Sequence, residues 1–175
     1  MKFTTIELFK EAMKFSAAHF TIFSSTERER LHGHNFTVHA EIKAEINDNG
    51  ITFDYGLYKE KILELCRSLN EYLLLPTLSP YLAVRQIDQE VHAIFAKEKL
   101  VFLARDVRLL PIRNITVEEL ASWFLEQLVQ SSELKNLAIC GLVIKVFSGP
   151  GQSGSASWGA FKSQAQSSDE VDDVA

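Results

Sequence analysis

Residues 31–42 read LHGHNFTVHAEI, and this stretch holds both the clearest strand pattern of the chain and its most unusual pair of histidines. From residue 35 onward polar and apolar side chains alternate, the apolar ones being Phe36, Val38, Ala40 and Ile42. Successive side chains of a strand point to opposite faces of the sheet, so this alternation predicts a half-buried strand over residues 34–46. The chain is therefore expected to build a sheet with one covered face.

The flanking segments predict an α+β domain. Residues 3–20 and the stretches 142–148 and 155–161 read as further strands, with a turn at 47–50. Apolar residues at helical spacing predict one helix after an N-cap at Asp54 and another after Thr116, where Glu119 completes a capping-box pattern. Residues 81–110 indicate an inserted hairpin. We expect one α+β domain over 1–162, with two helices on one face of an antiparallel sheet, and a disordered acidic tail at 163–175.

The composition excludes several classes of protein. Of the 175 residues, 46% are hydrophobic and 23% are charged, as in a globular domain with a buried core. Four acids in the last seven residues supply most of the formal charge of −5, so no basic patch for nucleic acid or anionic lipid is visible. No apolar run approaches the roughly 18 residues of a membrane-spanning helix. The expectation is a cytoplasmic protein with a small-molecule ligand.

Three of the five histidines, His19, His32 and His34, are candidate metal ligands. Side chains at i and i+2 of a strand share a face about 6.5–7 Å apart, so His32 and His34 can converge on one ion. His19 ends a neighbouring expected strand and would complete a three-nitrogen site, which suits zinc and leaves a fourth position open. Alternatively, the two strand histidines are only polar side chains on a solvent-facing surface.

Four segments in this order resemble the 6-pyruvoyl-tetrahydropterin synthase and 6-carboxytetrahydropterin synthase family: FSAAHF (15–20), LHGHNFTVHAEI (31–42), GITFDYGLYKEKI (50–62) and NITVEELASWF (114–124). The resemblance implies a tunnelling fold, in which four-stranded antiparallel sheets from several subunits close a barrel. It implies a homohexamer, a dimer of trimers, with active sites at subunit interfaces and Zn²⁺ held by His19, His32 and His34. It also implies a lyase acting on 7,8-dihydroneopterin triphosphate or a related pterin.

The sequence departs from this family at three positions of its site. The family has a catalytic cysteine shortly before the paired histidines, where this chain has residues 27–30, ERER. An Asp-His pair after the first helix is replaced by Asn70 and Glu71, and the glutamate that anchors the pterin ring is replaced by Phe147 or Ser148. The longer segment at 81–110 is a further difference.

Carboxylates are the candidates to replace the missing base. By position these are Glu27, Glu29 and Glu71, any of which could accept a proton if burial raised its pKa towards neutrality. Some relatives with glutamate in place of the cysteine cleave the side chain of the same substrate. The alternative for Glu27 and Glu29 is a solvated charge cluster with the neighbouring arginines.

For the ring pocket, the resemblance assigns substrate contacts to Thr116 and Glu118, whose alternative role is simply to begin a helix. A second function also stays open at this stage. A non-catalytic member of the fold could bind a pterin-like or purine-like ligand and keep the zinc for structure alone. A fourth protein ligand closing the tetrahedron would favour that reading, and an open position would favour catalysis.

Overall fold

The computed structural model describes residues 1–135 and 137–160, so the expected tail at 163–175 lies outside the described residues. The elements in chain order are β1 (Phe3–Leu8), β2 (Lys14–His19), β3 (His32–Glu45), α1 (Gly56–Leu69), β4 (Tyr72–Pro76), β5 (Leu82–Ile87), β6 (Glu90–Phe95), β7 (Glu98–Leu103), a 3₁₀ turn (Ala104–Asp106), β8 (Val107–Leu110), α2 (Val117–Gln130), β9 (Ile139–Gly149) and β10 (Gln152–Gly159). Neither α-helix of this described part is long and apolar enough to cross a membrane.

The central sheet has seven strands in the order β10-β9-β3-β2-β4-β8, with β1 also paired to β3. The four expected antiparallel strands are present, and the α+β class is confirmed, but the sheet is larger than expected for two reasons. The first strand is split into β1 and β2, because residues 9–13 bulge out opposite only two residues of β3. In addition, β4 and β8 extend the sheet in parallel beside β2.

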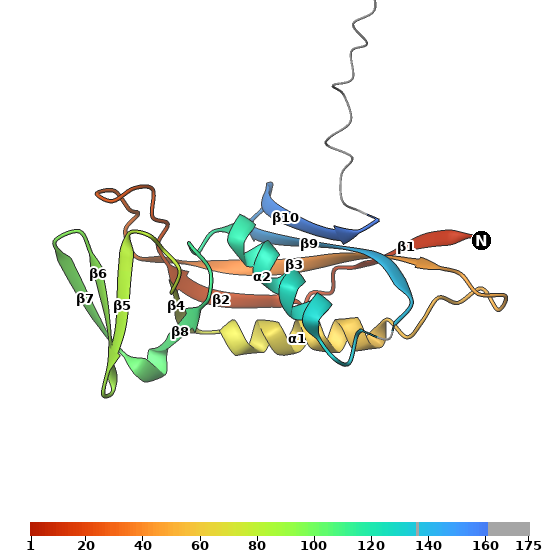
Figure 1. The fold of residues 1–175 in the computed structure, drawn as a ribbon, viewed down its shortest axis with the longest axis horizontal. Helices are drawn as coiled ribbons and strands as arrows, with labels where there is room; N and C mark the ends of the chain where they lie inside the picture. The colour runs from red at the N-terminus through yellow and green to blue at the C-terminus, as the bar shows by residue number, and fades with distance from the viewer. Residues whose placement is uncertain (136, 161–175) are drawn as a thin grey trace, which may run out of the picture.

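Both helices lie on the same side of this sheet (Figure 1). Phe15, Phe36, Ile62 and Phe124 are almost fully buried between the sheet and the helices, at 0–1% exposure. Helix α2 begins as expected, because the Thr116 side chain accepts a hydrogen bond from the Glu119 N–H. The Glu119 carboxylate, however, binds the backbone N–H and the guanidinium of Arg113 instead of completing the capping box.

The first helix is shorter than the sequence pattern suggests. Its N-cap is Tyr55, one residue later than expected, although Asp54 still accepts a hydrogen bond from the Gly56 N–H. It ends at Leu69, because Asn70 and Glu71 turn away to bond the backbone of Ser16 in β2. The apolar run that follows, residues 72–76, is therefore strand β4 and not a helical turn.

The insertion at 81–110 is more than a hairpin. It forms a three-stranded antiparallel sheet, β5-β6-β7, which stands at one end of the central sheet beside the loop 20–31 (Figure 1). Its inner face has its own buried cluster, in which Leu82, Val91 and Phe95 pack with Phe20 and Ile22 of that loop. The inserted sheet thus rests on the segment that connects β2 to β3.

Gly154 lets β10 pass over the beginning of α2. A Cβ atom at this position would lie 2.6 Å from the Glu118 nitrogen and 2.6 Å from the Val117 carbonyl carbon, which are backbone atoms fixed by the helix. We expect Gly154→Ala to lower the free energy of unfolding by about 1–3 kcal/mol through overpacking. The matched control is Gly149→Ala, whose Cβ would meet nothing within 4 Å. Urea unfolding of both variants tests this, and equal stabilities would contradict it.

Candidate metal centre and its cleft

His19, His32 and His34 meet at the end of β2 and β3, on the face of the sheet that the helices cover. The antiparallel register places His19 opposite His32, and His34 opposite Ala17, so the three rings share one face. One nitrogen from each ring lies within 4.8 Å of the other two. The three candidate ligands from the sequence are therefore brought together by the pairing of two adjacent strands.

Hydrogen bonds fix how two of the rings are protonated. The Nδ1 atoms of His19 and His32 lie 2.9 Å and 2.8 Å from the carbonyl oxygens of Ile115 and Arg30, which can only accept. Each Nδ1 must therefore donate, and in the neutral ring each Nε2 keeps its lone pair. Burial lowers the pKa of His19, against the opposing effect of its bond to Ile115, so this ring stays in the neutral, ligating form.

The cluster fits a tetrahedral cation. His19 Nε2 is buried and has no hydrogen-bond partner among the described residues, an arrangement that is costly unless something binds it. The Nε2 atoms of His32 and His34 are 3.1 Å apart. Two nitrogens bound to tetrahedral zinc at about 2.0–2.1 Å would be separated by about 3.3 Å, close to this value. The donor set and its spacing thus suit Zn²⁺.

Glu29 is the candidate base that lies at this cluster. Its carboxylate is 3.9 Å from His32 Nε2 and accepts a hydrogen bond of 2.9 Å from the Thr21 N–H. Burial alone would raise the pKa of Glu29, but the hydrogen bonds from Thr21 and the nearby His32 and His19 outweigh it and lower the pKa. The condition considered from the sequence, a pKa raised by burial, is therefore not met at Glu29, which is held as a carboxylate.

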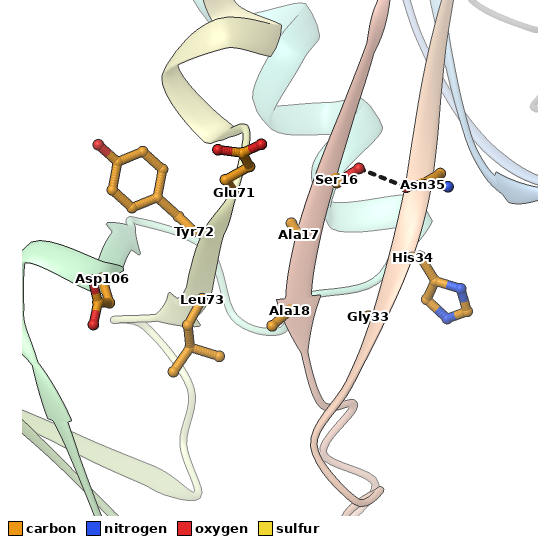
Figure 2. A pocket seen from close by; sticks show the side chains of 10 residues that line it. All are labelled: Ser16, Ala17, Ala18, Gly33, His34, Asn35, Glu71, Tyr72, Leu73 and Asp106. Atoms are coloured by element: carbon orange, nitrogen blue, oxygen red, sulfur yellow. Dashed lines mark hydrogen bonds between the residues drawn. The ribbon is translucent and has the colours of Figure 1, made fainter.

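The other two candidate bases lie elsewhere. Glu27 is exposed at the tip of the loop, where its backbone carbonyl accepts bonds from Phe23 and Ser24. Glu71, with a positive φ of 65°, is exposed in a second groove of about 470 Å³, of which His34 is also a lining residue. This groove opens on the helix-free face of the sheet (Figure 2). Figure 2 shows this groove, with Glu71 beside the start of β4 and the His34 ring pointing away from it. Within one subunit, Glu71 therefore does not lie at the histidine cluster.

A cleft of about 450 Å³ opens over the cluster. Besides the three histidines and Glu29, it is lined by the two expected substrate-binding residues, Thr116 and Glu118, at the start of α2. Ser148 and Gln152 face them from β9 and β10. Of the two positions considered for the missing ring anchor, Ser148 is thus the one in the cleft. Phe147 instead packs at a tilt against His39, with ring centroids 4.5 Å apart.

Sequence reasoning missed Gln152 and Asn114. The Gly-Pro-Gly segment at 149–151 signals the tight turn that brings Gln152 back beside Ser148. The Asn114 amide bonds both the N–H and the carbonyl of Ile22, at 3.1 Å and 2.8 Å, and thereby ties the loop 20–31 to the segment that holds His19. No local sequence signal marks such a long-range clamp.

Neither cysteine can replace a catalytic thiolate in this cleft. Cys66 lies on the buried face of α1, where it is 1% exposed and burial raises the pKa of its thiol to about 12. Cys140 is half-buried in β9. Among the residues that line the cleft, Glu29 and Glu118 are the carboxylates, and the three histidines are the candidate metal ligands.

Comparisons with known proteins agree with this geometry. The sequence model of the 6-pyruvoyl tetrahydropterin synthase family matches residues 7–153. A Methanocaldococcus jannaschii protein that is proposed to be a 6-carboxy-5,6,7,8-tetrahydropterin synthase is 27% identical over 131 residues, which are 74% of this chain and 78% of that protein. A Pyrococcus horikoshii protein with the same proposed activity is 28% identical, over 72% of this chain and 77% of its own length.

Solved structures show the same fold. The 6-pyruvoyl tetrahydropterin synthase of Plasmodium vivax is 24% identical with a TM-score of 0.84, and the match covers 91% of this chain and 99% of that one. The Plasmodium falciparum protein is 27% identical with a TM-score of 0.82, covering 90% and 98%. Two further Plasmodium vivax structures are of variants in which a glutamate, described as a catalytic residue, is replaced by alanine or cysteine.

Proposed function

Because the chain belongs to the 6-pyruvoyl tetrahydropterin synthase family, whose members are pterin synthase lyases, we propose that it is a zinc-dependent lyase acting on 7,8-dihydroneopterin triphosphate or a related pterin. The reaction is of the 6-carboxy- or 6-pyruvoyl-tetrahydropterin synthase type. One observation carries the proposal: three imidazole nitrogens and the Glu29 carboxylate converge at one end of a cleft large enough for a bicyclic ring.

A metal ion would be held by His19, His32 and His34, with the Nε2 atoms of His19 and His32 free to bind it. A bound Zn²⁺ would polarise the hydroxyl groups of the substrate side chain and so make the neighbouring C–H protons more acidic. The carbonyl oxygens of Ile115 and Arg30 orient two of the rings through Nδ1, and such outer contacts raise the basicity of the ligating nitrogen. With only these three protein ligands, a tetrahedral zinc ion would have a fourth position available to the substrate.

Glu29 is the proposed base. Its lowered pKa keeps it ionised at neutral pH. The oxygen that lies near His32, Oε2, is also the one that accepts the Thr21 N–H, and its second lone pair is available to a proton of the substrate. The Plasmodium vivax protein, in which a glutamate is described as a catalytic residue, supports the view that this fold can use a carboxylate. Glu27 and Glu71 lack such a place at the cluster.

The far end of the cleft is the proposed ring pocket. The Thr116 hydroxyl and the N–H groups of the first turn of α2 supply hydrogen-bond donors. The Glu118 carboxylate, at the same helix start, can accept from the amino and ring N–H groups of a pterin. Ser148 and Gln152 add neutral hydrogen-bonding groups where the family places a glutamate.

We further propose a cytoplasmic homohexamer, built as a dimer of trimers. One face of the central sheet has no helix over it, and β1 and β10 each pair on one side only within the described part of the chain. Strand pairing between copies at these edges would close the barrel that the fold implies. Mass photometry tests this, with six times 19.8 kDa expected and a monomer contradicting it.

The deciding experiment is a turnover assay. Zinc-loaded and metal-stripped protein are incubated with 7,8-dihydroneopterin triphosphate, and triphosphate release and the mass of the pterin product are followed. Zinc-dependent release is expected, and the product mass then distinguishes the carboxy, pyruvoyl and side-chain-cleaved outcomes. Equal release from both preparations, above a blank without protein, would reject zinc dependence. No release above that blank from either preparation would reject the lyase for this substrate and favour a non-catalytic, ligand-binding role.

A further inference from the structure

The loop 20–31 presents neighbouring side chains to two different parts of the molecule. Ile22 pairs with Arg28 in an antiparallel bridge, and the Glu29 N–H donates to the Thr21 carbonyl at 2.8 Å. In such a ladder, successive side chains point to opposite sides. Glu29 accordingly faces the histidine cleft, whereas Arg28 faces the inserted sheet β5–β7.

Arg28 is held on its side by an unusually complete set of contacts. Its Nε and one terminal nitrogen donate to the same Glu98 oxygen on β7, at 3.1 Å and 2.5 Å. The guanidinium carbon lies 4.9 Å from the ring centre of Phe20 and 5.7 Å from that of Phe95 on β6. The Arg28 side chain is 16% exposed, although that of Glu98 is 58% exposed. Stacking and burial of the arginine, more than the exposed ion pair, therefore fix its position.

The remaining nitrogen of Arg28 reaches the backbone of the proposed base. It donates 2.9 Å to the carbonyl oxygen of Glu29. The peptide that follows Glu29 is thus fixed by a side chain anchored in the insertion, and the carboxylate is fixed by Thr21. The insertion packs on the same loop through Phe20 and Ile22, so the two contacts reinforce each other.

We propose that the inserted sheet β5–β7 is a brace for the catalytic loop, and that Arg28 is the positioning residue through which it sets the place of Glu29. This inference rests on the proposed function in so far as Glu29 is the base. A shift of about 1 Å in a catalytic group can cost about 100-fold in rate, so a brace outside the cleft can control turnover without touching substrate.

The test compares Arg28→Gln, Arg28→Lys, Glu98→Gln and the Arg28→Gln/Glu98→Gln double variant. For Arg28→Gln, kcat is expected to fall about 10–100-fold, with KM within threefold and zinc content unchanged. Arg28→Lys should recover little of the lost kcat, because an ammonium group cannot stack on Phe20 and also donate hydrogen bonds to both Glu98 and the Glu29 carbonyl. Glu98→Gln should have a smaller effect, and the double variant should be no worse than Arg28→Gln, because both remove one contact network. Arg85→Gln and Lys99→Gln, exposed on the insertion, are the matched controls and should match the wild type.

A separate readout keeps this inference distinct from the proposed function. Hydrogen exchange of the amides of Thr21 and Glu29 should be at least tenfold faster in Arg28→Gln than in the controls, and faster by a smaller factor in Glu98→Gln, whether or not the protein turns over the pterin. A wild type without turnover would reject the function and leave the brace to be judged by exchange. Unchanged kcat in an active enzyme, or unchanged exchange, would overturn the brace. If Arg28→Gln does not fold, Arg28→Lys, which keeps the charge but not the stacked guanidinium, decides.

Discussion

Replacing His32 by alanine is expected to lower the affinity for zinc by more than about 100-fold and to reduce pterin turnover to the background of the assay. Loss of a mere hydrogen-bonding partner of a metal ligand typically costs about 10–100-fold in affinity, and removal of the ligand itself should cost more. His32 is the suitable position, because its side chain is 37% exposed, whereas the buried His19 also contributes to packing. Zinc per chain, measured by elemental analysis after dialysis, tests the first part of this prediction.

His92→Gln is the matched control for the metal centre. This histidine lies on β6 of the insertion, where it bonds Glu90 at 2.8 Å and is not part of the histidine cluster. The control should bind one zinc per chain, as the wild type is expected to do. If His32→Ala retains stoichiometric zinc, the three-histidine site is wrong. If it loses zinc but keeps full turnover, the metal has a structural role and the second function considered from the sequence gains support.

The parts of the fold that depend on local signals could be predicted from the sequence. Strand β3 follows from its alternation, and α2 follows from the Thr116 cap and its apolar stripe. Strand β4 could not be predicted, because the apolar run at 72–76 also suits the last turn of a helix. Contacts of Asn70 and Glu71 with Ser16, more than fifty residues away, decide between the two. Likewise, β5 gains its stability from pairing with β6.

The candidate site also has one part that could be predicted from the sequence and one part that could not. Period-two spacing predicts that His32 and His34 share a face, and strand pairing adds His19. The choice among Glu27, Glu29 and Glu71 depends on the register of a short hairpin, since a shift of one residue would turn Arg28 towards the histidines and Glu29 towards the insertion. The Ile22–Arg28 bridge and the hydrogen bonds of Asn114 to Ile22 set that register. No sequence pattern at these residues predicts either contact.

Glu29→Gln is expected to lower kcat by about 10²–10⁴-fold while leaving zinc binding intact. Positioned general acid–base groups typically contribute this much to a rate. Glutamine keeps the size of the side chain and an oxygen that can accept the Thr21 N–H, so the loop should stay in place. Glutamine lacks only the negative charge that allows the glutamate carboxylate to accept a proton. Triphosphate release under saturating substrate, together with zinc per chain, measures the two effects separately.

The matched controls are Glu27→Gln and Glu71→Gln, which make the same chemical change at the other two candidate positions. Glu27 is exposed at the loop tip, and Glu71 lies in the groove on the opposite face of the sheet. If each active site consists of residues from one subunit only, both variants should stay within about twofold of the wild-type rate. A large loss for Glu71→Gln alone would mean that the base comes from a neighbouring subunit, across the helix-free face. A large loss of kcat in Glu27→Gln, together with a wild-type kcat in Glu29→Gln, would mean that the loop rearranges when substrate binds. Loss confined to Glu29→Gln would identify the carboxylate beside the histidines as the replacement for the missing cysteine.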